Sequence, residues 1–363
     1  MSELSINSLY IHIPFCKKKC RYCDFISFEE YLPQYIYNVV DEIPQGSYKT
    51  VYIGGGTPSL LPLYFMQIIP VLGNVATEET TFEVNPGTAV FTYLRGLAYF
   101  DINRLSIGFQ STHDRLLKLL GRTHSAEDAL RCFDDAVRAG FSNINIDLMF
   151  GLPGQSLDDW AETLDTVCSL GPTHISLYSL TPAEGTPLWA DIESGEIVMP
   201  PDELNRRMYH MAREKLSKYR HYEISNFALP GFESRHNTAC WRLLPYRGVG
   251  LGAHSFDGLR RWRNTEDLSE YMLEQREMDI VYLDVIHLTE QDLMGEYMML
   301  GLRMLDGVHE ADFRLRFGKE LVSVFGNEIN ALIAKGLLVH NNGAVRLSDT
   351  GLDFANRVFA EFI

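Results

Sequence analysis

The sequence predicts an α/β fold: a partial (β/α)6 barrel of the TIM type, followed by a C-terminal helical, winged-helix-like module. Two observations predict the barrel. Six short runs of β-branched and aromatic residues alternate with helical patterns, and cysteine-rich or glycine-rich loops follow the first two runs. Such alternation is typical of parallel strands joined by crossover helices, with the chemistry at the C-terminal ends of the strands. A third observation, a hairpin pattern between two helical patterns near residue 340, predicts the module.

Each element of the barrel has its own signal. Strand patterns occupy residues 8–13, 50–53, 80–84, 104–107, 143–150 and 174–180. The first helix is expected over residues 31–43. Two later helices begin with a capping box, Ser125 with Asp128 and Ser156 with Asp159, and a glycine follows the end of each.

The C-terminal part is helical from about residue 289. We expect a helix over 325–335, a hairpin over 336–347 that turns at Asn342-Gly343, and one last helix over 350–362. Few cations cluster here, so contact with protein or closure over the barrel is expected rather than DNA binding. The expected division of the chain is 1–230 for the barrel, 231–288 for a connecting segment and 289–363 for the module.

Composition excludes several classes of protein. The 363 residues are 46% hydrophobic and 22% charged, which is typical of a globular protein with an ample core. A net charge of −16 argues against nucleic-acid binding. No run of about 18 apolar residues and no signal-peptide pattern occurs, so neither a membrane span nor export is expected, and the predicted location is the cytoplasm.

Three cysteines lie close together with the spacing CxxxCxxC: Cys16, Cys20 and Cys23. Four thiolates normally saturate a cubane iron–sulfur cluster, so three from one loop would leave one iron open to another ligand. The alternative, a structural zinc site, needs four ligands, and the nearby sequence does not offer a fourth. The other cysteines are scattered and do not form a disulfide framework.

Glycines also mark possible binding loops. Gly54-Gly55-Gly56-Thr57 follows the second strand pattern, where backbone groups can approach a ligand closely, although a tight turn explains the glycines equally well. A later stretch, Gly248-Val-Gly250-Leu-Gly252, superficially fits a dinucleotide loop. No convincing strand pattern precedes it, so we expect a tight backbone crossing instead.

Over nearly its full length, the chain resembles radical S-adenosylmethionine (SAM) proteins of the branch that includes oxygen-independent coproporphyrinogen III oxidases and HemW-type heme chaperones. The resemblance implies that the three cysteines hold a [4Fe-4S] cluster whose fourth iron is chelated by SAM. Reduction by a cellular electron donor then cleaves SAM to a 5′-deoxyadenosyl radical. It assigns SAM contacts to Tyr10, Tyr22, Gly55, Gly56, Thr57, Glu83, Gln110, Arg122 and Asp147.

Some of these positions have a second interpretation. Asp147 lies in an apolar run, where an unpaired buried carboxylate costs several kcal/mol, so a functional role is favoured. Gln110 and Arg122 fit exposed loop positions equally well without the resemblance.

Two stretches bear on the branch of the family. The oxidases carry a further cysteine two residues after the third one, where this chain has Phe25, and a long extension before the motif. The chaperones carry an HNxxYW sequence associated with heme, and here His236-Asn-Thr-Ala-Cys240-Trp241 has a cysteine in place of the tyrosine. His236 or Cys240 is a candidate iron ligand and Trp241 a flat apolar wall, although His236 fits a packing role equally well.

The sequence therefore predicts a heme chaperone that binds a [4Fe-4S] cluster, SAM and heme and passes heme to an acceptor hemoprotein. The alternative is an oxygen-independent coproporphyrinogen III oxidase, a dehydrogenase-type oxidoreductase that decarboxylates propionates by radical chemistry. A third possibility is a scaffold that keeps the cluster only for structure.

Overall fold

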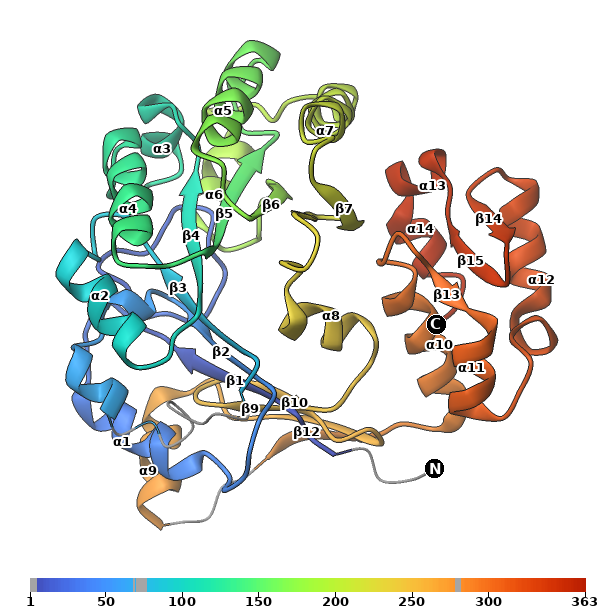
Figure 1. The fold of residues 1–363 in the computed structure, drawn as a ribbon, viewed down its shortest axis with the longest axis horizontal. Helices are drawn as coiled ribbons and strands as arrows, with labels where there is room; N and C mark the ends of the chain where they lie inside the picture. The colour runs from blue at the N-terminus through green and yellow to red at the C-terminus, as the bar shows by residue number, and fades with distance from the viewer. Residues whose placement is uncertain (1–4, 68, 70–76, 278–281) are drawn as a thin grey trace.

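The computed structural model describes residues 5–67, 69, 77–277 and 282–363. Figure 1 shows a large sheet wrapped by helices and, beside it, the module formed by the C-terminal part of the chain. Within the described residues the large sheet has twelve strands in the order β12-β11-β10-β9-β1-β2-β3-β4-β5-β6-β8-β7. No described helix is both long enough and apolar enough to cross a membrane.

The six predicted barrel strands are present, parallel and adjacent in chain order. They are β1 (Ser8–Ile13), β2 (Thr50–Gly55), β3 (Glu79–Val84), β4 (Arg104–Gln110), β5 (Asn143–Phe150) and β6 (His174–Ser179). The predicted partial barrel is therefore confirmed. The parallel register brings the C-terminal ends of all six strands to one end of the barrel.

Helices cover the outer face of these strands. They are α1 (Pro33–Glu42), the short 3-10 helices η1 (Pro58–Leu60) and η2 (Leu63–Gln67), α2 (Phe91–Tyr99), α3 (Asp114–Leu119), α4 (Ala126–Arg138), α5 (Leu157–Leu170), α6 (Pro187–Glu193) and α7 (Asp202–Lys215). The two predicted capping boxes are confirmed at the starts of α4 and α5. Outward strand residues such as Ile11 and Phe82 pack with helix residues such as Trp160 in one buried apolar cluster.

The sheet continues beyond the six strands at both edges. On one side lie β8 (Asn226–Ala228) and β7 (Arg220–Glu223); on the other lie β9 (Tyr246–Val249), β10 (His254–Phe256), β11 (Arg260–Arg263) and β12 (Leu283–His287). The helices α8 (Arg235–Trp241) and α9 (Leu268–Glu277) belong to the same stretch. Residues 231–288, expected to be a connection, thus contribute four strands to the main sheet.

The expectation that no strand precedes Gly248-Val-Gly250 is wrong, because β9 includes Gly248 and pairs in parallel with β1. The strand was hard to recognise because it is four residues long and contains Arg247. That cation is buried and forms an ion pair with Glu42 of α1, 205 residues earlier in the chain. The partner that allows a charge in this strand is invisible in the local pattern.

The C-terminal module consists of α10 (Glu290–Gly301), β13 (Val308–His309), α11 (Glu310–Phe317), α12 (Leu321–Ala334), β14 (Leu338–Asn341), β15 (Ala344–Leu347), α13 (Asp349–Asp353) and α14 (Ala355–Phe359). The hairpin is confirmed, with Asn342 and Gly343 both at positive φ, as a two-residue type I′ turn requires. The single last helix is wrong: the chain breaks at Phe354 into two short helices.

The barrel interior is polar. The fully buried ring of His174 lies 2.6 Å from the Asn145 side-chain oxygen and 2.9 Å from the Tyr222 hydroxyl. Asn145 also donates to Asp147. Arg104 is buried beside them, with Nη1 3.4 Å from Thr81 Oγ1. Hydrogen bonds, rather than apolar packing, therefore hold the inner layer of the barrel together.

Candidate functional site

A cavity of about 590 Å³ opens at the C-terminal ends of the barrel strands. It is lined by all three motif cysteines and by most of the residues for which the sequence predicts SAM contacts. These lining residues are Cys16, Cys20, Tyr22, Cys23, Gly55, Gly56, Thr57, Glu83, Gln110, Arg122 and Asp147. Segments that are more than 100 residues apart in the chain thus meet at one end of the barrel.

The cysteine loop leaves β1 and is fixed by backbone hydrogen bonds. The Cys16 amide donates to the Phe28 carbonyl at 2.9 Å, and the Arg21 amide donates to the Leu120 carbonyl at 3.0 Å. Phe15, next to the first cysteine, is buried with its ring edge against Tyr35. The loop is therefore held at both ends of the motif, so the thiols are presented from a defined backbone.

Two side chains donate toward the cysteine sulfurs. Thr57 Oγ1 lies 3.5 Å from Cys16 Sγ, and Arg122 Nη1 lies 3.5 Å from Cys20 Sγ. Burial raises the pKa of the Cys23 thiol. Among the described residues no three metal-binding side chains meet at one ion-sized point, but each cysteine of a cubane binds a different iron. Spread thiols with donors beside them fit such a cluster.

The glycine loop packs directly on the cysteine loop. A Cβ at Gly56 would lie 2.8 Å from the Phe15 carbonyl and 3.0 Å from Cys16 Sγ. Gly55 has a φ of +117°, and a Cβ there would lie 2.6 Å from the ring of His12. A tight turn alone does not explain these glycines, because a side chain at Gly56 would press on the Cys16 sulfur and one at Gly55 would press on the His12 ring.

Glu83 supplies a carboxylate at the cavity wall. It accepts hydrogen bonds from the Tyr52 hydroxyl at 2.8 Å and from the Gly55 amide at 3.0 Å. Burial raises its pKa to about 7, although these two donors act in the opposite direction. The group is thus poised to ionise when a cation, such as an ammonium, enters beside it.

Asp147 is the second carboxylate in the cavity. It accepts hydrogen bonds from Ser106 Oγ and Asn145 Nδ2, both at 2.8 Å. Burial raises its pKa, and the hydrogen bonds from Ser106 and Asn145, followed by the charge of the buried Arg104, act in the opposite direction. The apolar run of sequence did not reveal these partners. Both are polar side chains that point into the barrel, one from β4 and one from β5.

Arg122 is held inside the site rather than in an exposed loop. Its Nη2 donates to Asn85 Oδ1 at 2.8 Å and to the Gly108 carbonyl at 3.0 Å. Gln110 ends β4 with a φ of +65° and also lines the cavity. The interpretation of these two residues as exposed loop positions is therefore wrong.

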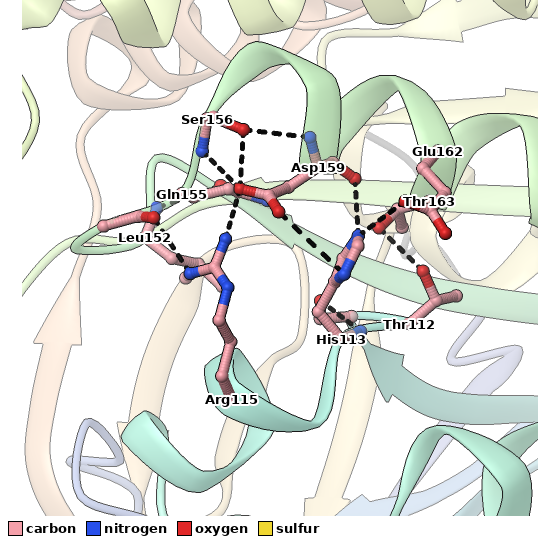
Figure 2. A network of polar contacts seen from close by, with 11 residues as sticks. Thr112, His113, Arg115, Leu152, Gln155, Ser156, Asp159, Glu162 and Thr163 are labelled. Atoms are coloured by element: carbon pink, nitrogen blue, oxygen red, sulfur yellow. Dashed lines mark hydrogen bonds and ion pairs between the residues drawn. The ribbon is translucent and has the colours of Figure 1, made fainter.

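A polar network fixes the loop that follows Gln110 (Figure 2). The ring of His113 lies 3.1 Å from the Asp159 carbonyl, and Arg115 forms an ion pair with the Asp159 carboxylate. Asp159 also completes the capping box of α5. The same carboxylate thus caps α5 and fastens the loop after β4 to that helix.

Tyr10 lies outside this set. It does not line the cavity, and its hydroxyl is 2.9 Å from Nδ1 of His12. The other ring nitrogen of His12 lies 3.3 Å from the Ile26 carbonyl of the cysteine loop. Tyr10 and His12 therefore form a layer below the site. Tyr10 is connected to the cysteine loop through His12 and does not itself line the cavity.

Three further wall residues have no prediction from the sequence. Tyr52, Asn85 and Tyr178 line the cavity. Tyr52 and Tyr178 lie on inward positions of β2 and β6, so the period-2 alternation of these strands was a usable signal. Asn85 directly follows β3, at the strand end where site residues concentrate.

The structure does not gather the three predicted heme residues around one cavity. His236 is buried, with Nδ1 3.0 Å from Thr50 Oγ1 and its ring against Tyr52. Cys240 is half-buried, and burial raises its thiol pKa to about 12. Trp241 packs under the Arg303 guanidinium. None of the three lines the cavity at the cysteines or the two cavities beside α8.

Comparison with known proteins agrees with this geometry. The radical SAM superfamily model matches residues 10–167, and the HemN C-terminal domain model matches residues 288–354. The heme chaperone HemW of Bacillus subtilis is 35% identical, with 99% of each chain covered, and that of Escherichia coli is 32% identical over the full length of both. The mouse mitochondrial radical S-adenosyl methionine domain-containing protein 1 is 34% identical, covering 95% of this chain and 84% of that protein.

The solved structure of coproporphyrinogen III oxidase HemN from Escherichia coli superposes with a TM-score of 0.83 at 22% identity, covering 99% of this chain and 90% of that one. This likeness confirms the radical SAM barrel with its C-terminal module. Family membership implies a [4Fe-4S] cluster and SAM. The three thiols, the donors Thr57 and Arg122 and the close-packed glycine loop at Gly55 and Gly56 fit these groups. On its full-length similarity to these relatives, the chain belongs to the HemW family of the radical SAM superfamily.

Proposed function

We propose that this protein is a heme chaperone that holds a [4Fe-4S] cluster on Cys16, Cys20 and Cys23, binds SAM beside it, and delivers heme to an acceptor hemoprotein. The single observation that carries the proposal is the full-length similarity to proteins named heme chaperone HemW. The cluster supplies one-electron chemistry once a cellular electron donor reduces it.

The residues of the chain have separate roles in this proposal. Thr57 and Arg122 donate hydrogen bonds to the sulfurs of Cys16 and Cys20, which suits the negative charge of iron-bound sulfur. Glu83 pairs with the ammonium group of SAM, and the Gly55 amide orients that carboxylate. Phe25, 63% exposed at the cavity rim, presents an apolar side chain where the oxidases are expected to have a cysteine.

The test is hemin titration of the anaerobically reconstituted protein, followed by mixing with apomyoglobin as an acceptor. We expect a Soret band at one heme per chain and transfer of that heme to the acceptor. Conversion of coproporphyrinogen III with SAM and dithionite, without saturable hemin binding, would instead establish the oxidase alternative.

A cysteine variant checks the cluster assignment. Cys16→Ala should remove the cluster absorbance at about 400 nm, a region of thiolate-to-iron charge transfer. Cys168→Ala, outside the motif, is the matched control and should retain that absorbance. An intact cluster in Cys16→Ala would refute the assignment of the ligands.

A further inference from the structure

A cavity of about 710 Å³ lies between the main sheet and the C-terminal module. The turn between β10 and β11 forms one wall, and α10, β13 and α11 form the other. A second cavity, of about 530 Å³, shares Arg242, Leu244, Met304 and Asp306 with it, so the two form one continuous cleft beside α8. Its size is in the range of sites that bind ligands of several hundred daltons.

The cleft wall exposes large apolar side chains from both sides. Leu259 of the β10–β11 turn is 51% exposed, and Leu315 of α11 is 87% exposed. Tyr297 and Phe317 add aromatic faces between them. A planar apolar molecule would remove this surface from water, at about 25 cal/mol per Å².

Two guanidinium groups stand in this apolar wall without a carboxylate partner among the described residues. They belong to Arg242, which follows α8, and to Arg316 of α11, whose guanidinium lies over the rings of Tyr297 and Phe317. Arg316 donates to the carbonyls of Arg242 and Leu243, which fixes the two segments side by side. Two such cations suit a ligand that carries two carboxylates.

The acidic residues of the cleft do not cancel these charges. Asp257 is paired with Arg260, and Asp306 is paired with Arg220. In the second cavity, Glu78 is paired with Arg235 and Glu233 with Arg220. Asp312, at the start of α11, is the lining carboxylate without an ion pair in the described part of the chain. Among the described lining residues, Arg242 and Arg316 thus stand against Asp312, so the groups without an ion pair leave an excess of one positive charge in a chain whose net charge is −16.

The cleft also contains an imidazole. His309 ends β13, lies immediately before α11 and is exposed. No hydrogen bond or ion pair to its ring occurs within the described part of the chain, in contrast to His340, which is paired with Glu310. A free imidazole beside an apolar wall is a suitable axial ligand for heme iron.

We propose that heme binds in this cleft, with His309 ligating the iron and with Arg242 and Arg316 pairing with the two propionates. This assignment rests on the proposed heme chaperone function and relocates the heme from His236, Cys240 and Trp241 to the neighbouring surface. The His236-to-Trp241 helix then acts as the support that presents Arg242.

The experiment compares hemin with metal-free protoporphyrin IX on the full-length reconstituted protein. His309→Ala should shift the Soret band and weaken hemin binding at least tenfold, while leaving protoporphyrin IX binding unchanged, because only hemin has an iron. Arg242→Gln and Arg316→Lys should weaken both ligands. The matched controls are His340→Ala and Arg314→Gln, whose partners Glu310 and Glu320 lie outside the proposed contacts.

The outcomes separate this inference from the proposed function. If wild-type protein binds hemin and His309→Ala binds it with the same spectrum and affinity, the cleft assignment is wrong and the chaperone proposal stands. If Cys240→Ala alone abolishes the Soret band, the heme lies at the motif instead. If wild-type protein binds no hemin, both proposals fail. Unchanged far-UV circular dichroism and cluster absorbance would exclude a folding defect in each variant. Arg242→Gln is expected to fold normally because the Arg242 side chain is exposed.

Discussion

Arg122 donates from its Nη1 to the Sγ of Cys20 across 3.5 Å, although the two residues are 102 positions apart in the chain. Hydrogen bonds to Asn85 and to the Gly108 carbonyl fix the guanidinium. It therefore stays beside the sulfur when the charge on the sulfur changes. A positive charge held in this way favours added negative charge on nearby sulfur.

Arg122→Gln should therefore lower the reduction potential of the reconstituted cluster. A charge-assisted hydrogen bond is worth about 1.5 kcal/mol, which corresponds to about 60 mV for one electron. Spectroscopic redox titration measures this shift. Arg131→Gln, which removes an exposed arginine of α4 paired with Asp128, should leave the potential unchanged. A potential that is equal in both variants would show that Arg122 does not act on the cluster.

Gly56→Ala should prevent stable cluster binding. The added methyl would lie 3.0 Å from Cys16 Sγ and 2.8 Å from a backbone oxygen that cannot move freely. Iron and sulfide analysis after reconstitution should show less than half of the wild-type content. Gly326→Ala in α12 meets open space and should keep full content, with unfolding free energy higher by about 0.5–1 kcal/mol. Full cluster content in Gly56→Ala would mean that cluster binding does not need the close approach of Gly56 to the cysteine loop.

Glu83→Gln should weaken SAM binding by tenfold or more, because a charge-assisted hydrogen bond to the ammonium is worth about 1.5–3 kcal/mol. Since the pKa of Glu83 is raised to about 7, its ionised form grows as pH rises from 6 to 8, and wild-type affinity should rise over the same range. Anaerobic equilibrium dialysis with labelled SAM measures both effects. Glu127→Gln, on the exposed start of α4, is the control. If SAM affinity still rose with pH in Glu83→Gln, a group other than Glu83 would cause the pH dependence.

His236→Gln should destabilise the fold, with a cost that depends on pH. Burial lowers the pKa of His236 from 6.5 to about 4, so this group's stabilisation is complete above pH 6.5 and is lost as pH falls toward 4. The loss amounts to about 3 kcal/mol. Urea unfolding at pH 7.5 and at pH 5 should therefore show a smaller difference between wild type and variant at pH 5.

The control for this comparison is His287→Gln on β12, where the ring is exposed. It should cost little at either pH. A loss of stability in His236→Gln that is equal at pH 7.5 and pH 5 would contradict a buried neutral ring at this position.

The sequence predicted the six barrel strands and the cysteine and glycine loops because each has a local signal, in periodicity, spacing or both. Arg122 needed the family resemblance, since its partner Asn85 lies at the end of another strand. The cost of an unpaired carboxylate in an apolar run already singled out Asp147, but its partner Ser106 lies on the neighbouring strand. β9 was missed because the charge of Arg247 is neutralised by Glu42, far away in the chain. The cleft at His309 also depends on residues that are far apart in the chain. It forms only where the β10–β11 turn and the end of α8 meet the C-terminal module.

The pairing of β9 with β1 has a consequence for how the protein is made. Strand β1 leads directly into the cysteine loop, yet its second neighbour lies more than 230 residues later in the chain. During synthesis one edge of β1 therefore remains open after β1–β6 have emerged, and an open edge is prone to wrong pairing. Residue 249 must therefore leave the ribosome before both edges of β1, the strand that leads into the cysteine loop, can be paired.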